Sequence, residues 1–190
     1  MKRSIGARTL IYPNPVLIIG TYDAEGNPNA MTAAWGGICS SNPPSVAFSI
    51  QKSRCTYENL METRVCTISI PSEDFVREAD YFGIVSGKKT DKFKATGLTP
   101  LRSDLVNAPF VGEFPVVIEC RVTNSIEIGV HTQFICEILD VKIDEAAFGS
   151  DGKPDMTIIR PFMYDAMKRE YRGFGPLLAP AFSAGSMFPR

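Results

Sequence analysis

Alternation of apolar and polar residues, which is typical of β-strands, recurs along most of the chain. Val46, Phe48 and Ile50 alternate with smaller or polar neighbours over residues 46–50. Two apolar runs, at 15–22 and 30–35, flank a turn-like segment and predict a first hairpin. Similar patterns predict further strands at 64–70, 115–123, 131–143 and 156–162.

Two stretches have a helical pattern instead. Residues 57–62 follow a polar turn, and Thr56 with Asn59 resembles an N-cap pair that would start a helix there. Phe75, Ala79 and Phe82 fall at helical spacing and predict a second helix that ends near residue 84.

The segments between these elements have the composition of turns and loops. We expect a solvated, basic loop at 88–94, a long connection at 98–112, a turn near 124–125, a loop at 148–154 and an irregular tail at 172–190. Six or more strands with two helices predict a mainly β, antiparallel barrel with capping helices. At 190 residues, the chain is expected to form a single domain over 1–190.

Composition narrows the choice of partners. Hydrophobic residues make up 44%, and 20 Lys plus Arg nearly balance 21 Asp plus Glu, which argues against a nucleic acid or anionic membrane as the main partner. No apolar run reaches the roughly 18 residues of a membrane span, and we expect no signal peptide. Five cysteines without a C-x-x-C motif and a single histidine predict no metal site and a reducing, cytoplasmic location.

Reactive side chains in recognisable catalytic patterns are scarce. His131 is the only histidine, no G-x-S-x-G elbow presents a serine, and no paired carboxylates have a glycosidase-like context. Residues 83–89 resemble a P-loop, but only three residues separate the glycines, and no G-x-G-x-x-G is present. This scarcity favours a bound cofactor as the source of the chemistry.

A candidate anion site lies where the strand at 46–50 passes into the helix. Ser53, Arg54 and Thr56 would place hydroxyls, backbone N–H groups and a planar cation at a helix N-terminus, which suits a phosphate. The alternative is a capped helix that binds nothing, because most such helices with a nearby arginine have no ligand.

These residues also carry a resemblance. Three motifs in order along the chain, N-A-M-T-x-A-W, S-x-x-P-P and S-R-x-T-x-x-N-L, resemble the flavin reductase-like family, whose FMN-binding split barrels include the flavoredoxins. The matching positions are Asn29, Ala30, Met31, Thr32, Ala34, Trp35, Ser40, Pro43, Pro44, Ser53, Arg54, Thr56, Asn59 and Leu60, followed by 86–87, 91–93 and 129–131. Lys88-Lys89-Thr90 departs from the family, in which an arginine and an acidic residue are common there.

The resemblance implies a split β-barrel that binds FMN, with the phosphate held by Ser53, Arg54 and Thr56. The full set that it implies for FMN binding is Asn29, Ala30, Met31, Thr32, Ala33, Trp35, Ser49, Ser53, Arg54, Thr56, Asn59, Ser86, Asp91, Lys92 and Phe93. Thr32 and His131 are the expected catalytic residues. Core packing is the alternative for Trp35, Tyr164 and Tyr171, and a structural hydrogen bond is the alternative for His131.

Two functions follow from the resemblance. The first is an oxidoreductase that passes electrons from NAD(P)H through FMN to a flavin or redox-protein acceptor, and the second is a flavoredoxin-type electron carrier without NAD(P)H activity. A third interpretation keeps the barrel but replaces FMN with haem or another ligand. The family also implies a homodimer.

Overall fold

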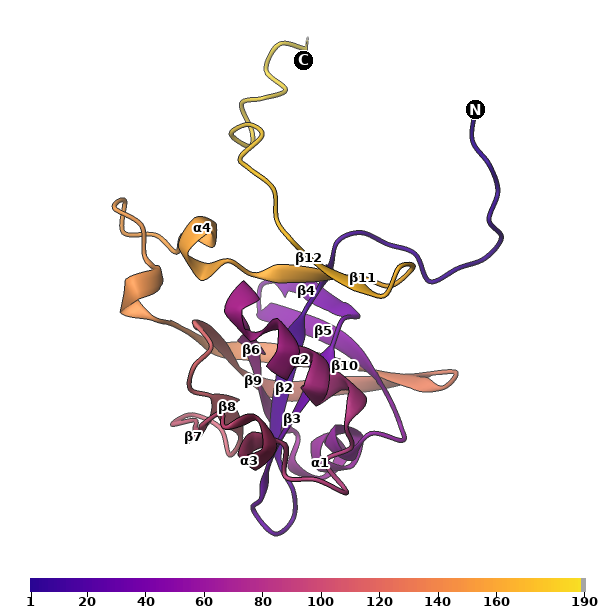
Figure 1. The fold of residues 1–190 in the computed structure, drawn as a ribbon, viewed down its shortest axis with the longest axis vertical. Helices are drawn as coiled ribbons and strands as arrows, with labels where there is room; N and C mark the ends of the chain where they lie inside the picture. Colours follow the sequence, from indigo (N-terminus) through magenta and orange to yellow (C-terminus); the bar gives the residue numbers. More distant parts are fainter. Residues whose placement is uncertain (189–190) are drawn as a thin grey trace.

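The computed structural model describes residues 1–188 and shows a β-barrel from which both termini extend as arms (Figure 1). The strands are β1 (Asn14–Pro15), β2 (Leu17–Tyr22), β3 (Pro28–Ala33), β4 (Gly36–Ser41), β5 (Pro44–Gln51), β6 (Val65–Ile70), β7 (Pro100–Arg102), β8 (Pro109–Val111), β9 (Val116–Ile128), β10 (His131–Ile143), β11 (Phe162–Asp165) and β12 (Glu170–Gly173). The helices are α1 (Cys55–Thr63), α2 (Val76–Ile84), α3 (Lys92–Thr96) and α4 (Met156–Ile159), with short 3₁₀ turns at Glu73–Phe75 and Glu145–Ala147.

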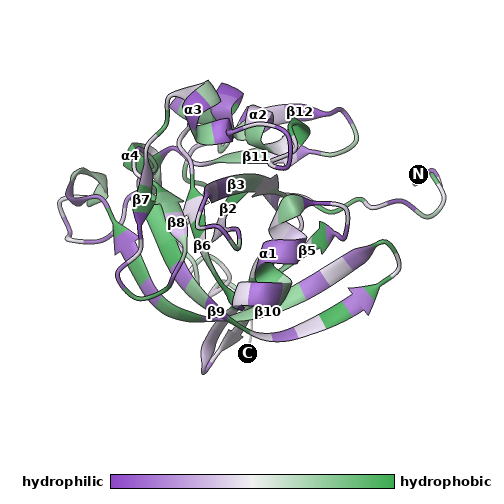
Figure 2. Ribbon diagram, turned by 90° about the horizontal axis from the view of Figure 1, so that it is seen from below, coloured by the Kyte–Doolittle hydropathy of each residue, from purple (hydrophilic) through white to green (hydrophobic). Residues whose placement is uncertain are grey.

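Seven strands form the main sheet in the order β3-β2-β6-β9-β10-β5-β4, and all neighbouring strands are antiparallel. The sheet curves around an interior where α1 is seen between β3 and β5 (Figure 2). The edge strands β3 and β4 do not pair with each other in the described residues, so the barrel stays open on one side. The mainly β, antiparallel split barrel that the sequence predicts is therefore confirmed.

Alternate residues of β2 enter two different cores, which explains why its sequence is apolar on both faces. Leu17 and Ile19 face the barrel interior, where they join Phe48 and Phe134. Ile18, and Val16 just before the strand, face outward, where they share a core with Phe82 of α2 and Phe93 of α3. Each fully buried side chain of this size contributes about 1.5–3 kcal/mol to stability, so α2 and α3 are held to this face mainly by apolar burial.

A second small sheet, in the order β1-β11-β12, lies across one end of the barrel (Figure 1). Tyr12 ties the N-terminal arm to it, because the Tyr12 hydroxyl donates to Asp165 Oδ1 at 2.8 Å. None of the helices described for residues 1–188 combines the length and hydropathy that crossing a bilayer requires.

Several predicted boundaries were wrong. The helix expected from residue 57 begins at Cys55, and Arg54 rather than Thr56 occupies the N-cap position. Thr56 and Asn59 are buried instead and bond to other elements, so they are not a capping pair. The predicted strand at 156–162 is helix α4 followed by β11, because the Asp155 side chain accepts from Thr157 N and caps a helical turn.

Three further connections differ from expectation. The predicted turn at 124–125 lies inside β9, which runs unbroken to Ile128 and pairs with β10 with a register shift beside Thr123. The connection at 98–112 contains the β7–β8 hairpin. The basic loop at 88–94 includes the start of α3, and its Lys92 is buried rather than solvated. β12 also extends to Gly173, into the predicted irregular tail.

Candidate functional site

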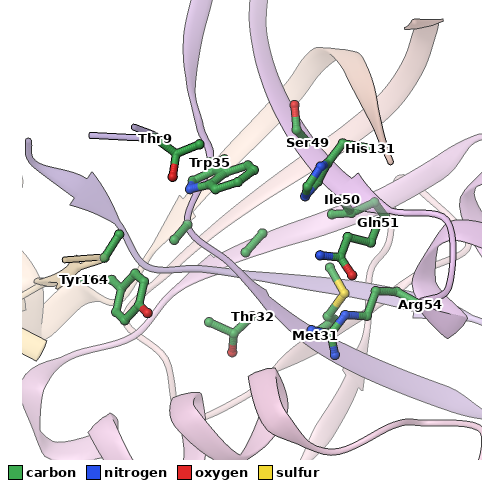
Figure 3. A pocket seen from close by; sticks show the side chains of 13 residues that line it. Thr9, Met31, Thr32, Trp35, Ser49, Ile50, Gln51, Arg54, His131 and Tyr164 are labelled. Atoms are coloured by element: carbon green, nitrogen blue, oxygen red, sulfur yellow. The ribbon is translucent and has the colours of Figure 1, made fainter. Parts of the chain in front are cut away.

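A cavity of about 410 Å³ opens beside the N-terminal end of α1. Its volume is within the range of roughly 300–1,000 Å³ that is typical of small-molecule sites. In Figure 3, side chains from β3, β5, β10 and β11 and from the residue that precedes α1 surround the space, with Tyr164 and Arg54 on opposite sides of the view. The lining residues are Thr9, Met31, Thr32, Ala33, Ala34, Trp35, Ser49, Ile50, Gln51, Arg54, His131, Tyr164 and Ala166.

Small and flat side chains shape this cavity. Ala33 and Ala34 add little bulk beyond the backbone of β3 and its extension, so a planar ligand could lie close to the chain. The rings of Trp35 and His131 form one wall, with centroids 4.7 Å apart and planes tilted by 41°. His131 is the first residue of β10 and pairs in register with Gln51 of β5, which fixes the position of its backbone at the cavity.

Arg54 connects the site to helix α2. Its guanidinium donates from NH1 to the carbonyl oxygen of Gly83 at 3.1 Å, in the last turn of α2. A cation at this position interacts favourably with the negative end of the helix dipole. A guanidinium has five N–H donors, so this bond leaves others for a ligand. Arg54 lines the main cavity and two smaller ones beside it.

One of the smaller cavities forms a polar cradle next to Arg54. Its lining is Asn29, Met31, Arg54, Cys55, Thr56, Val85, Ser86, Gly87 and Lys92. Asn29 donates from Nδ2 to Thr56 Oγ1 at 2.9 Å, but its buried Oδ1 has no hydrogen-bond partner within residues 1–188. Hydroxyls, an amide and two cations around one small space are the groups that bind a phosphate. The chemistry of these residues therefore suits a phosphate, and the cradle, which at about 10 Å³ holds roughly one water, must widen to admit it.

Lys92 is the second cation of this cradle. It is buried, and its ammonium donates to the carbonyl oxygen of Phe82 at 3.1 Å. Burial, with a smaller contribution from the nearby Arg54, lowers the pKa of Lys92 to about 8. An anion bound beside it would oppose this effect, because an opposite charge favours the protonated amine.

Thr32 lines the cavity and also makes a hydrogen bond that joins β3 to α2. Its hydroxyl donates a short hydrogen bond to the carbonyl oxygen of Ala79 in α2. With its proton used in this way, Thr32 can only accept a hydrogen bond from a ligand. The sequence did not predict this limit, because the α2–β3 contact is a tertiary one.

Five predicted site residues line neither the main cavity nor the cradle: Ala30, Ser53, Asn59, Asp91 and Phe93. Ala30 and Phe93 are buried in the core beneath α2 and α3. Asn59 donates to Thr21 Oγ1 at 2.9 Å and so ties α1 to β2. Asp91 caps α3 by accepting from Lys94 N, and Ser53 is exposed. The other predicted residues all line one of the two cavities.

Several lining residues were not predicted. Gln51 ends β5 next to the predicted turn, and Cys55 and Gly87 flank predicted residues, so their sequence neighbourhood could have identified them. Thr9 and Ala166 come from the N-terminal arm and the β11–β12 turn. No local pattern marks these two, because only the tertiary fold brings them to the cavity.

Comparison with known proteins places this geometry in a family. A sequence model described as "Flavin reductase like domain" matches residues 8–174. The solved structure of flavoredoxin of Desulfovibrio vulgaris (Miyazaki F) is 51% identical, covers 97% of this chain and 100% of its own, and superposes with a TM-score of 0.93. Flavoredoxin from Methanosarcina acetivorans is 28% identical, covers 98% of both chains and has a TM-score of 0.90.

A curated relative carries an enzymatic name. FMN reductase (NADH) RutF of Pseudomonas syringae pv. syringae (strain B728a) is 22% identical over 129 residues, which are 67% of this chain and 69% of that protein. The family match spans most of the chain, including every residue that lines the main cavity and the cradle. The chain therefore belongs to the flavin reductase-like family.

Proposed function

We propose that this protein binds FMN and passes electrons through it from NAD(P)H to a flavin or redox-protein acceptor. The observation that carries the proposal is the cradle, in which the cations Arg54 and Lys92 and the Thr56 hydroxyl line one space beside a cavity large enough for a flat ring system. The names of the similar proteins support FMN as the cofactor, since they include flavoredoxins and an FMN reductase.

The cradle would hold the phosphate of FMN. Arg54 and Lys92 supply two cations, and charge-assisted hydrogen bonds of this kind are about twice as strong as neutral ones. Ser86 and the backbone at Gly87 offer further donors from the opposite side. Lys92 is held by its bond to Phe82 and by burial, so its position is set before the ligand arrives.

The main cavity would hold the ring system. Met31, Ala33 and Ala34 present a surface of sulfur, methyl groups and backbone, while Trp35 and His131 close one side. When bound, FMN would supply the redox chemistry by accepting a hydride equivalent and passing electrons on. The protein's own contribution would be orientation, exclusion of water, and cations near developing negative charge.

An electron carrier is the second candidate function. The 51% identity and nearly complete overlap with a flavoredoxin favour it, whereas the enzymatic name belongs to a relative of 22% identity. Both functions use the same FMN site. They differ in whether NADH or NADPH reduces the bound flavin directly.

We also propose that the protein forms a homodimer. The support is the C-terminal arm, on which Leu177 and Leu178 are 87% and 93% exposed although both are large and apolar. Such side chains are usually covered in soluble proteins when they occur together. Size-exclusion chromatography with light scattering would test this, and a monomeric mass at micromolar concentration would contradict it.

The experiment for the main proposal is a titration of the purified apoprotein with FMN, followed by anaerobic mixing with NADH or NADPH. Binding with a shifted flavin absorbance, followed by rapid bleaching on mixing, would support the reductase. Binding without bleaching would support the carrier. A protein that is colourless as purified and does not bind added FMN would overturn both.

A further inference from the structure

A second cavity, of about 250 Å³, adjoins the main one on the side of α2 and the small sheet. The two share Thr32, Ala34, Arg54 and Tyr164 in their linings, so a ligand in one lies next to a ligand in the other. We call it the α2 cavity. Asp80 of α2 and Tyr171 of β12 line its far side and do not line the main cavity.

Asp80 is held in place by Tyr171. The Tyr171 hydroxyl donates to Asp80 Oδ1 at 2.9 Å. The ring of Tyr171 in turn packs edge-on against Phe162, at 5.5 Å between centroids, and against Tyr164 at 5.6 Å. Burial and the hydrogen bond to Asp80 raise the pKa of Tyr171, so its proton stays on the hydroxyl at physiological pH.

The polar groups on this side of the cavity are mainly acceptors. An ionised carboxylate accepts only, and it has about four lone-pair sites, of which Tyr171 uses one. The hydroxyl protons of Tyr171 and Thr32 are donated to Asp80 and to the Ala79 carbonyl, which leaves both oxygens as acceptors. A ligand that presents N–H donors therefore matches this side of the cavity, and an anionic group does not.

We propose that the α2 cavity is a subsite for the carboxamide of a nicotinamide ring, with Asp80 accepting from its NH₂ group. A primary carboxamide has two N–H donors for Asp80 and one oxygen for a donor, and Arg54 lines the same cavity as Asp80. The oxidised ring is also a cation, which the Asp80 carboxylate would attract. The subsite rests on the proposed function, because it places the nicotinamide beside the expected flavin cavity.

A purely structural role is the competing explanation for the pair, since the Asp80–Tyr171 bond joins α2 to β12. Asp80→Asn separates the two roles. Asparagine keeps the oxygen that accepts from Tyr171 but removes the charge and replaces the second oxygen with a donor. Tyr171→Phe does the reverse. It removes the hydrogen bond between α2 and β12 and leaves the carboxylate in the cavity.

The test compares wild type, D80N, Y171F and the control D140N, all loaded with FMN. Asp140 is exposed on β10 and lines neither cavity. Three quantities are measured: the Kd for FMN, the calorimetric Kd for NAD⁺ as a probe that cannot reduce the flavin, and KM for NADH. We expect D80N to raise the NAD⁺ Kd and the NADH KM by roughly 10- to 100-fold, with the FMN Kd unchanged. Y171F should raise them less, and D140N should leave them unchanged.

Two results for D80N would overturn the subsite. One is an NAD⁺ Kd and NADH KM in D80N equal to those of wild type. The other is an FMN Kd that rises in parallel in D80N, because Asp80 would then belong to the flavin site. Wild-type protein that binds FMN but neither NAD⁺ nor NADH also rejects the subsite while leaving FMN binding intact. Failure of wild type to bind FMN rejects the proposed function itself, and the subsite with it.

Discussion

Asn29 donates from Nδ2 to Thr56 Oγ1 at 2.9 Å, and this bond joins β3 to the first turn of α1. Both side chains are buried, and Gly87 lies against the free Oδ1 of Asn29. Since Oδ1 is an acceptor, it would bind a ligand N–H or O–H, or a water that hydrates a phosphate. The cradle is therefore built by three segments that are distant in sequence.

Gly87→Ala should damage the cradle. A Cβ at this position would lie 2.2 Å from Asn29 Oδ1, which forces the Asn29 side chain away from Thr56. We expect a loss of about 1–3 kcal/mol in the free energy of unfolding, the cost of breaking a buried hydrogen bond, together with weaker FMN binding. Urea denaturation of the apoprotein and FMN titration would measure the two effects.

Gly37→Ala is the matched control for this change. Gly37 lies in β4, and a Cβ there would meet no atom within 4 Å in the part of the chain that the structure describes. It should leave FMN affinity unchanged. Equal FMN affinity in the Gly87 variant and wild type would show that Asn29 does not need its present position to form the site.

Arg54→Ala should weaken FMN binding by about 2–3 kcal/mol, the range for a lost hydrogen bond to a charged group. The guanidinium lines the cradle, the main cavity and the α2 cavity, so Arg54→Ala removes a charged donor from all three. Arg77→Ala is the control, because Arg77 is exposed on α2 and lines none of these cavities. An FMN titration that gives the same Kd for Arg54→Ala as for Arg77→Ala would remove Arg54 from the phosphate site.

FMN affinity should depend on pH through Lys92. Because burial lowers the pKa of Lys92 to about 8, the free protein holds this side chain charged below that pH and increasingly neutral above it. A bound phosphate favours the charged form, so binding above pH 8 requires uptake of a proton. The Kd should be flat from about pH 7, above the second pKa of a phosphate ester near 6, and should then rise by up to tenfold per pH unit above 8.

Lys92→Met tests this assignment directly. It keeps the apolar stem of the side chain but has no titrating group, so its FMN Kd should be higher than that of wild type and independent of pH over the same window. Lys94→Met, on the exposed side of the same helix, should keep the wild-type profile. A wild-type Kd that does not change between pH 7 and 9.5 would contradict a role for the Lys92 charge.

The strands were predictable where one face is buried, and were mislocated where neither face is. The alternation at 116–122 predicted the first half of β9, but beyond Thr123 both faces of that strand are exposed. There the strand persists because its backbone pairs with β10 in a hairpin, and backbone pairing does not require alternating apolar side chains. Glu119 shows the opposite case. Its position on the predicted polar face did not indicate that it is fully buried and bonded to Ser103 and Lys142.

The site was predictable where its residues are contiguous and was incomplete where they are not. Met31 to Trp35 and Arg54 to Thr56 each form a short run that carries the family resemblance, and the structure brings the two runs together. Asp80 lies on a helix that the sequence placed correctly, but nothing in the helical pattern shows which face meets β12. Thr56 and Asn59 were misread as caps because a capping residue and a buried hydrogen-bonding residue have the same polarity.

His131 and Trp35 allow the expected catalytic role of the histidine to be tested. Their rings lie 4.7 Å apart, and both residues line the cavity. This position of His131 suits two roles, as part of an aromatic wall or as an acid–base catalyst. We expect His131→Ala to weaken FMN binding by about 0.5–1.5 kcal/mol, the energy of an aromatic pair, and His131→Phe to restore it. The rate of flavin reduction by NADH at saturating concentration separates the roles. If the ring acts only as a wall, the flavin in His131→Phe is reduced at the wild-type rate. If His131 transfers a proton, the rate of flavin reduction in His131→Phe falls by roughly 100-fold or more.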